Sequence, residues 1–294
     1  MTAGGEPLGF KAMNQRVIMT VHAHPDDESS KGAGTIAKYR DLGVSSVLVC
    51  CTGGEEGEIH NDEVVLEPGE SLGERRSKEL DAATAIIGYE VVERLGHRDS
   101  GMPDMEANKR PDAFWNIPLE QSIRELVALV RRYRPTVLIS YPDAQHEYPH
   151  PDHLRAHDIT LAAFDAAADP SAYPELGEPH HVAKLYYTVW PVMQSRLLHE
   201  KHLELGLKSP YEERLAWINR DVPFTTSIDI RGYQAVRDNA LKAHATQIDP
   251  ESPWWFGLTE EIRHNIHPYD HYRLAKSRVG AIDVEETDLF EGIE

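Results

Sequence analysis

Apolar runs and amphipathic segments alternate along the first half of the chain. Apolar, β-branched runs predict strands over residues 16–23, 45–52, 90–96 and 136–142. Apolar positions at helical spacing predict helices over residues 32–42, 73–87 and 119–133. Strands that alternate with helices in this way form parallel sheets with crossover connections. We therefore predict an α/β fold with a Rossmann-like, mainly parallel sheet flanked by helices.

The pattern becomes less regular in the second half of the chain. Residues 168–179 are typical of a loop, 184–190 predict a strand and 231–248 predict a helix. We expect three parts: a flexible N-terminus at 1–15, a Rossmann-like core at 16–170, and a C-terminal part at 171–294 that completes the sheet and forms a smaller irregular lobe over the substrate cleft.

A cluster of polar residues follows each of the four strands predicted in the first half. The clusters are "HAHPDDE" (22–28), "TGGEEGE" (52–58), "GHRDSGM" (96–102) and "YPDAQHEYPHPDH" (141–153). The carboxyl ends of parallel strands meet at one edge of the sheet, where ligands bind in open α/β folds. The clusters are therefore expected to converge on one site.

The first and last clusters contain a pattern typical of a catalytic metal ion. His24 and Asp27 lie three residues apart around Pro25, and His153 comes from the end of a distant strand. Two histidines and one carboxylate are a ligand set of catalytic zinc, which keeps a position open for water. A divalent cation would also offset the repulsion among the crowded carboxylates. Asp26, beside a ligand, is then available as a base.

A purely structural interpretation of the first cluster is the alternative. Asp27 or Ser29 could cap a helix that begins near Ser30, and the histidines could be surface residues in a chain that has 16 of them. The second cluster at the same edge of the sheet favours the metal site, which would lie in the core at 16–170. The later histidines His264, His267 and His271 fit no zinc spacing, and we expect them at the surface.

Composition narrows the classes of ligand. The chain has 30 Lys and Arg against 49 Asp and Glu, a formal net charge of −19, which argues against binding to nucleic acid or to an anionic membrane. We expect a small-molecule ligand. The two cysteines, Cys50 and Cys51, are adjacent in a predicted strand, which suits neither a disulfide framework nor a metal knuckle. With no apolar stretch of about 20 residues and no signal-peptide core, a cytoplasmic protein is expected.

Several stretches resemble one enzyme family over nearly the whole chain. They are "HAHPDDESSKGAGTIAKY", "TGGEEGEI", "DSGMP", "YPHPDH", "AHATQIDP" and "ETDLFEGIE". The first and fourth resemble the metal-dependent de-N-acetylases of the phosphatidylinositol glycan class L (PIG-L, LmbE-like) family. The tail and "SSKG" are similar to its branch of mycothiol S-conjugate amidases. The resemblance implies a hydrolase with one Zn²⁺ per chain held by the three ligands above, with Fe²⁺ as the alternative metal.

The resemblance also implies roles for the residues around the metal. Asp26 would be the general base on the attacking water, and His150 would stabilise the oxyanion as an imidazolium. Tyr148 matches a tyrosine that helps to polarise the carbonyl, and Asp152 would orient His150. This agrees with the general chemistry of amide hydrolysis, in which an acid donates where negative charge develops.

Four further positions match residues that hold the substrate. Glu58, Arg76 and Asp99 would bind the glucosamine and inositol hydroxyls. Lys31 matches a lysine of the amidase branch, and its ammonium can donate up to three hydrogen bonds to an N-acylated cysteine. The structural alternatives are that Glu58 is a loop charge and that Arg76 and Lys31 are exposed helix residues.

The loop before the second motif departs from the family pattern. Residues 144–147, "AQHE", replace an asparagine and glycines, which puts the loop's mobility and the exact substrate in doubt. We predict cleavage of the amide between the cysteinyl carbonyl and glucosaminyl-inositol in mycothiol S-conjugates or a close thiol–sugar conjugate. The alternatives are an N-acetylglucosaminyl-inositol deacetylase and, disfavoured by Asp26, a non-catalytic metal or sugar binder. Homo-oligomerisation stays open.

Overall fold

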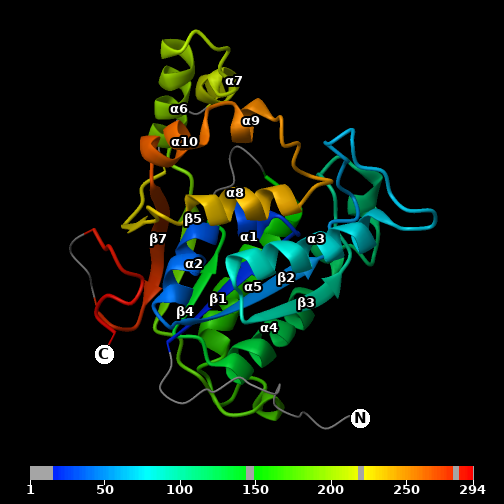
Figure 1. Ribbon diagram of the computed structural model, residues 1–294. Coiled ribbons are helices and arrows are strands. Elements are labelled where there is room, and N and C mark those ends of the chain that lie inside the picture. The colour runs from blue at the N-terminus through cyan, green and yellow to red at the C-terminus, as the bar shows by residue number, and fades with distance from the viewer. Residues whose placement is uncertain (1–15, 144–148, 218–221, 281–284, 294) are drawn as a thin grey trace.

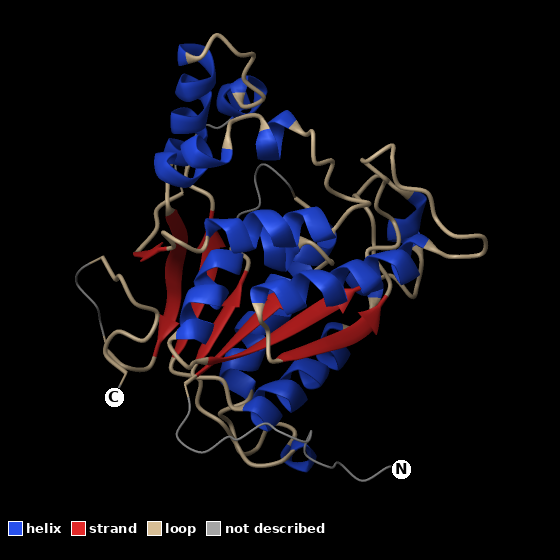
Figure 2. Cartoon of the chain, viewed as in Figure 1, coloured by secondary structure: helices blue, strands red, loops and turns tan. Residues whose placement is uncertain are grey.

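One seven-stranded sheet, in the order β3-β2-β1-β4-β5-β7-β6, organises the protein (Figures 1 and 2). The structure is a computed structural model that describes residues 16–143, 149–217, 222–280 and 285–293. The first five strands in this order, β3, β2, β1, β4 and β5, are parallel to one another, whereas β7 is antiparallel to both β5 and β6. The strands are β1 (Val17–His22), β2 (Ser45–Thr52), β3 (Val91–His97), β4 (Val137–Ser140), β5 (Lys184–Val189), β6 (Thr226–Asp229) and β7 (Tyr269–Ser277).

Helices cover both faces of the sheet (Figure 1). On one face α8 packs on α2 and α3, and on the other α4 packs on α5. A group of helices made of α6, α7, α9 and α10 stands above the carboxyl edge of the sheet. The helices are α1 (Asp27–Ser30), α2 (Ala33–Asp41), α3 (Leu72–Ile87), α4 (Leu119–Tyr133), α5 (Pro151–Ala166), α6 (Val192–Glu204), α7 (Glu212–Trp217), α8 (Gln234–Ala243), α9 (Pro253–Phe256) and α10 (Glu260–Ile266).

The central strands are buried on both faces, as expected of a parallel sheet between two helix layers. Every residue of β1 and β2 is buried. Alternate side chains of β1 enter different cores: Met19 packs in the cluster with α4 and α5, whereas Ile18 packs in the cluster with α2 and α8. The predicted α/β fold with a mainly parallel sheet is confirmed, and Cys50 and Cys51 lie buried in β2 as predicted.

The strand order indicates where a ligand would bind. The chain runs outward from β1 through β2 to β3 and then returns to β4 on the other side of β1. Such a switch point leaves a crevice at the carboxyl ends of the two strands, where ligands bind. The cluster "HAHPDDE" follows β1 and the cluster "YPDAQHEYPHPDH" follows β4.

The second half contributes more regular structure than its sequence pattern indicates. Strands β5, β6 and β7 join the sheet from beyond the predicted boundary at residue 170. His271 lies in β7 with 5 % of its surface exposed, so the surface position expected for this histidine is wrong. His271 is buried because β7 pairs with β5 on one edge and with β6 on the other. The sequence of β7 is largely polar and contains no apolar run that would predict a buried strand.

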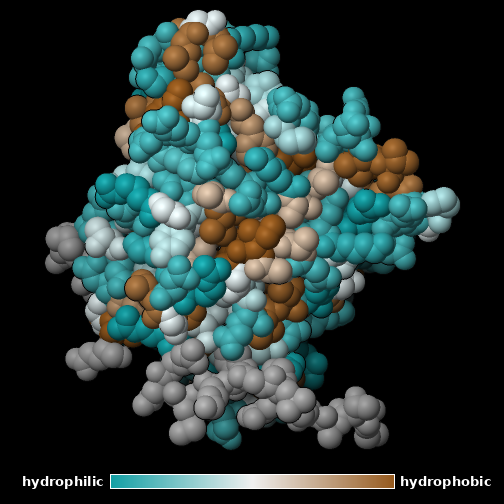
Figure 3. Space-filling model, viewed as in Figure 1, coloured by the Kyte–Doolittle hydropathy of each residue, from teal (hydrophilic) through white to brown (hydrophobic). Residues whose placement is uncertain are grey.

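The visible surface is largely hydrophilic, with hydrophobic residues gathered at the top over α6 (Figure 3). Exposed side chains there include Met193, Leu203 and Leu205. Among the described residues, each helix is too short or too polar to cross a bilayer. The predicted flexible segment 1–15 lies outside the described residues.

Candidate metal centre

The loop after β1 is folded tightly by two left-handed residues. Asp26 has φ 117° and Gly32 has φ 108°, and the single helical turn α1 lies between them. At Gly32 a side chain would also meet the Tyr272 hydroxyl, 2.7 Å from a Cβ position, so only glycine fits. A non-glycine residue in the left-handed region costs about 1–3 kcal/mol and is found mainly at functional sites. The strained Asp26 therefore marks this loop as a site rather than as a simple connection.

His24, Asp27 and His153 meet as predicted from the sequence. Asp27 Oδ2 lies 3.5 Å from His24 Nδ1 and 3.4 Å from His153 Nε2, and all three residues are buried. One ligand atom from each lies within 4.8 Å of the others. Two imidazoles and one carboxylate, fixed in a buried corner at the end of β1 and β4, form a donor set that suits a zinc-type divalent ion.

Other groups hold the Asp27 carboxylate in place. The Tyr141 hydroxyl donates to Asp27 Oδ2 over 2.7 Å and accepts from the backbone N–H of Ala23 over 2.8 Å. The Tyr141 ring stacks on the His153 ring at 4.3 Å. Sequence reasoning missed Tyr141, although its position at the carboxyl end of a buried strand beside the second cluster was a usable signal.

Burial and neighbouring charges shift the pKa values of the three predicted ligands. Burial alone would raise the pKa of Asp27, but Lys31 and His153 hold it well below its usual range. Burial lowers the pKa of His153 to about 3, which keeps this imidazole neutral. Burial would also lower the pKa of His24, but Asp99 and Asp152 raise it well above its ordinary value. The ionised Asp27 carboxylate and the neutral His153 imidazole are the protonation states that a metal ion requires, whereas His24 would release a proton when a metal binds.

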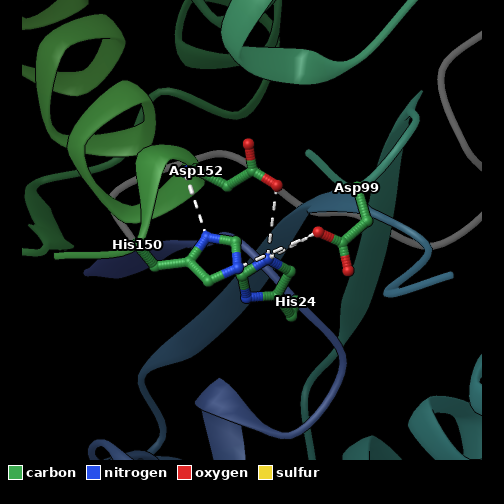
Figure 4. A group of neighbouring side chains, drawn as sticks. All are labelled: His24, Asp99, His150 and Asp152. Atoms are coloured by element: carbon green, nitrogen blue, oxygen red, sulfur yellow. Dashed lines mark hydrogen bonds and ion pairs between the residues drawn. The ribbon is translucent and has the colours of Figure 1, made fainter. Parts of the chain in front are cut away.

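A second group of donors shares His24 (Figure 4). His24 Nε2 lies 3.3 Å from Asp152 Oδ2 and 3.6 Å from Asp99 Oδ1, and His150 Nε2 lies 4.0 Å from the same Asp99 oxygen. Burial alone would raise the pKa of Asp99, but His24 holds it well below its usual range. The first group uses Nδ1 of His24 and the second uses Nε2, so the two nitrogens of this ring link the two groups of donors.

His150, predicted to act as an imidazolium, faces the site with Nε2. Its Nδ1 accepts a hydrogen bond from the backbone N–H of Asp152 over 3.2 Å, so the ring proton is on Nε2, which faces the site. Burial and the charge of His24 lower the pKa of His150 to about 4. In this state His150 is a neutral donor from Nε2.

The Asp152 carboxylate has other partners than His150. It accepts from the Ser100 N–H over 2.9 Å and from the Ser100 hydroxyl, and it faces His24. Asp152 thus contacts His150 through its backbone N–H, while its side chain ties the loop after β3 to the site. The orientation of His150 by Asp152 stays a prediction, and the contact available for it is this backbone N–H.

Asp26 and Arg76 form a pair beside the metal corner. Arg76 is 3 % exposed, so the alternative of an exposed helix residue is wrong. Its guanidinium donates to Asp26 Oδ2 over 3.0 Å, to Pro25 O over 2.6 Å and to Gly54 O over 2.8 Å. A Cβ at Gly54 would lie 2.4 Å from the guanidinium carbon, so the glycine of "TGGEEGE" makes room for Arg76. Burial raises the pKa of Asp26, and Arg76 opposes this rise.

Glu28 connects the metal loop to the second half of the chain. His244, just after α8, places Nε2 2.7 Å from Glu28 Oε1, and both side chains are fully buried. Glu28 Oε2 accepts from the Asp26 N–H over 2.9 Å. Sequence reasoning missed this pair, because His244 lies in "AHATQIDP" with no local metal-type or catalytic spacing.

The remaining predicted residues are spread around the site. Lys31 Nζ contacts Asp27 Oδ1 and lies 3.2 Å from Ser30 Oγ. Asp99 is buried, with its carboxylate bonded to the backbone N–H groups of Gly101 and Glu56. Glu58 is exposed, and within the described part of the chain its carboxylate makes no hydrogen bond. Tyr148 and the altered loop at 144–147 lie outside the described residues.

The capping alternative does not describe the loop. Helix α1 begins at Asp27, one turn earlier than the predicted start near Ser30, and has no side-chain cap. The Asp27 carboxylate instead accepts from the backbone N–H of His24, which precedes the helix, over 3.0 Å. The Ser29 hydroxyl donates to Glu28. The side chains of Asp27 and Ser29 therefore make hydrogen bonds within the metal loop and do not cap helix α1.

Comparisons with known proteins agree with this geometry. A family model described as GlcNAc-PI de-N-acetylase (PIG-L) matches residues 19–164. A mycothiol S-conjugate amidase of Streptomyces coelicolor is 41 % identical over 95 % of this chain and 98 % of its own. A 1D-myo-inositol 2-acetamido-2-deoxy-alpha-D-glucopyranoside deacetylase of Geodermatophilus obscurus is 38 % identical with the same two coverages. In fold, the chain is similar to N,N'-diacetylchitobiose deacetylase of Pyrococcus horikoshii, with a TM-score of 0.61 and 16 % identity over 89 % of this chain and 84 % of that one.

Proposed function

The chain belongs to the GlcNAc-PI de-N-acetylase (PIG-L) family, and we propose that this member is a zinc-dependent amidase of mycothiol S-conjugates or of a close thiol–sugar conjugate. Family membership makes it a hydrolase that acts on C–N bonds. The proposed bond is the amide between the cysteinyl carbonyl and glucosaminyl-inositol. A small-molecule substrate suits a buried corner in a chain of net charge −19. A cytoplasmic location stays a prediction.

The position of Lys31 carries the choice of an amidase. Its side chain is 28 % exposed, and its ammonium reaches into the metal corner to Asp27 and lies 5.8 Å from the centre of the Tyr141 ring. It is thus not a solvated helix lysine. A cysteine conjugate presents carbonyl and acetamide oxygens that can accept from an ammonium, whereas the methyl group of an acetyl substrate cannot. The Streptomyces coelicolor relative, an amidase by name, supports the same choice.

The residues divide the chemistry among them. His24, Asp27 and His153 would hold the metal, which when bound activates water and polarises the carbonyl as a Lewis acid. Asp26, held by Arg76, would take a proton from the attacking water and return it to the leaving amine. His150 would donate from Nε2 to the oxygen on which negative charge develops. Asp99 would accept from a sugar hydroxyl.

Deacetylation of N-acetylglucosaminyl-inositol is the second candidate. The Geodermatophilus obscurus relative is named for this reaction at 38 % identity, close to the 41 % of the amidase. Both reactions attack the carbonyl carbon of an amide on glucosaminyl-inositol, and they differ only in the acyl group. The metal corner serves either reaction, so only groups that face the acyl side can discriminate.

Substrate profiling with and without zinc tests the proposal. Chelator-stripped protein and the same protein reloaded with zinc are incubated with mycothiol S-conjugates and with N-acetylglucosaminyl-inositol, and products are detected by mass spectrometry. We expect zinc-dependent release of glucosaminyl-inositol and an N-acetylcysteine S-conjugate. Zinc-dependent release of acetate alone would move the function to the second candidate, and zinc-independent turnover would contradict the metal site.

A further inference from the structure

A cavity lies between α8 and the helical group above the sheet, away from the metal corner. Its walls come from the residues that directly follow β5 and β6, from α6, α8, α9 and α10, and from the segment before β7. Aromatic and charged side chains dominate the walls, among them Trp190, Trp254, Trp255 and Arg237. Its volume of about 50 Å³ is several times the roughly 10–15 Å³ that one water molecule needs. There is room for a small polar group rather than for a whole sugar.

Arg237 is the central cation of this cavity. Its guanidinium carbon lies 5.6 Å from the centre of the Trp190 ring and 5.9 Å from that of Trp255. Across residues 16–143, 149–217, 222–280 and 285–293, no carboxylate lies within ion-pairing distance of this guanidinium, and its buried Nε has no hydrogen-bond partner. Within the same residues, the buried indole N–H of Trp190 also has no acceptor. Buried donors without acceptors are costly, so an acceptor from a ligand is expected here.

The neighbouring acidic groups are already engaged. Asp238 Oδ2 pairs with Arg263 over 2.6 Å and with His264 over 2.9 Å. Asp270 Oδ2 accepts from the Thr35 N–H over 3.0 Å and from its hydroxyl over 2.8 Å. The hydrogen bonds of Asp238 and Asp270 thus go to other partners, and Arg237 acts on Asp270 only through its charge, from beyond ion-pairing distance.

Further cations and histidines surround Arg237. Arg214 lies over the Trp190 ring at 5.6 Å, so two guanidiniums contact this one indole. His264 and His267 also line the cavity. Of the two arginines in the described lining, Arg263 is paired with Asp238 and Arg237 is not. The Arg237 guanidinium and the Trp190 N–H therefore select for an anion. Arginine beside flat aromatic walls suits a planar anion such as a carboxylate.

Helix α8 links the cavity to the metal loop. Arg237 lies in this helix, and His244 directly follows it and bonds to Glu28 of the loop. Seven residues of α-helix separate the two positions by roughly 10 Å along the axis. Trp190 follows the carboxyl end of β5, which pairs with β4 in parallel, so the cavity lies at the same edge of the sheet as the metal corner.

We propose that this cavity binds a carboxylate carried by the S-linked group of the conjugate, and that Arg237 is the residue that selects for it. The inference rests on the proposed amidase function, because the amide must be at the metal while the sulfur substituent extends along α8. The enzyme would then prefer conjugates of electrophiles that bear a carboxylate over neutral conjugates of the same shape.

A matched pair of conjugates tests this preference. Mycothiol carrying an S-(4-carboxybenzyl) group is compared with mycothiol carrying the S-(4-carbamoylbenzyl) group, which has the same shape and no charge. In the wild type we expect kcat/KM to favour the carboxylate by about 10-fold or more, the scale of a charge-assisted hydrogen bond. Equal kcat/KM for the two conjugates in the wild type would overturn the proposal without any variant.

Variants then locate the preference. Arg237→Gln should bring the ratio of the two kcat/KM values close to one, and Arg237→Lys should retain part of it. Arg231→Gln is the control, because Arg231 is an exposed arginine paired with Asp229 outside the cavity, and it should keep the wild-type ratio. A ratio that survives in Arg237→Gln, with circular dichroism showing a folded protein, would place the selecting group elsewhere and overturn the assignment.

A binding measurement separates this inference from the proposed function. Calorimetry on chelator-stripped protein measures the affinity of the two free N-acetylcysteine S-conjugates, carboxybenzyl and carbamoylbenzyl. A preference for the carboxybenzyl compound that Arg237→Gln removes would support the cavity even if no conjugate is cleaved, in which case only the amidase function fails. If the conjugates are cleaved but neither assay discriminates between them, the amidase function stands and the cavity proposal falls.

Discussion

The Arg76 guanidinium donates to the Asp26 carboxylate over 3.0 Å, and the same nitrogen donates to the Pro25 carbonyl over 2.6 Å. One buried arginine from α3 thus holds the side chain of the left-handed Asp26 and the carbonyl of the residue before it, beside the metal corner. Asp26 directly precedes the predicted ligand Asp27, but Arg76 orients its carboxylate. This carboxylate is therefore suited to transferring a proton. Arg76 in this geometry orients the carboxylate that we propose as the base.

Asp26→Asn should keep the metal and lose activity. The amide retains the shape and can still accept from Arg76, but it cannot take a proton, so we expect kcat to fall by about 10²-fold or more. Metal content and kcat are measured on the same preparation. Asp81→Asn, at an exposed aspartate paired with Arg94, is the matched control and should leave both unchanged. An active Asp26→Asn enzyme would assign the base to another residue.

His153→Ala should lose the metal and keep the fold. The imidazole supplies one of three ligand groups and lies at the carboxyl edge of the sheet, where it stacks on Tyr141 at the end of one hydrophobic core. We expect less than stoichiometric zinc by elemental analysis after gel filtration, together with a wild-type circular dichroism spectrum. His60→Ala, at an exposed histidine, is the control. Stoichiometric zinc in His153→Ala would remove this residue from the ligand set.

At equal zinc content, Lys31→Ala should act mainly on one substrate. Zinc is measured on each preparation, because Lys31 also contacts Asp27 and an effect on that residue would lower turnover of both substrates. If the ammonium donates to the acylated cysteine, kcat/KM for the conjugate should fall by about 10-fold or more, in line with the roughly 1.5–3 kcal/mol of a charge-assisted hydrogen bond. Turnover of N-acetylglucosaminyl-inositol should change little. Lys78→Ala, at a lysine whose side chain is 69 % exposed, serves as the control. Equal losses on both substrates would show that Lys31 does not read the acyl group.

Acid should weaken the fold through His271. Burial, together with His267, lowers the pKa of His271 from 6.5 to about 4. In the unfolded chain this histidine takes up its proton at a higher pH than in the folded protein. Its contribution to the free energy of unfolding is therefore fully present above pH 6.5 and is lost as the pH falls toward 4.

Thermal melts of chelator-stripped protein at pH 7.5 and pH 4.5 measure this effect. His271→Gln, whose amide can still bond to Ser227, should lose less Tm between the two pH values than the wild type does. His181→Gln, at an exposed histidine, should follow the wild type. The same loss of Tm in His271→Gln and wild type would show that this histidine does not contribute to the acid sensitivity.

The first half of the fold is predictable from the sequence because its periodicities are strong. The strand over 45–52 and the helix over 119–133 have the predicted bounds, since one has a continuous apolar centre and the other has a wide apolar face. Parallel topology then places the carboxyl ends of β1 and β4 together without further information. For this reason the meeting of His24, Asp27 and His153 follows from spacing and strand order alone.

The second half of the fold and the supporting contacts are harder to predict. Strand β7 is polar and half-buried, so neither an apolar run nor strict alternation marks it. The bond between Glu28 and His244 joins residues 216 positions apart, and the pairing of Asp26 with Arg76 joins residues 50 apart. Such pairings depend on how helices pack over the sheet, and a local pattern contains no record of them.

Competition between the two candidate substrates tests the central claim most directly. Zinc-loaded enzyme is given equimolar mycothiol S-conjugate and N-acetylglucosaminyl-inositol in one tube, and mass spectrometry follows the early loss of each, so the ratio of the two rates is the ratio of kcat/KM. We predict a ratio of about 10 or more in favour of the conjugate, which Lys31→Ala lowers toward one. A ratio below one in the wild type, with acetate as the main acyl product, would contradict the account.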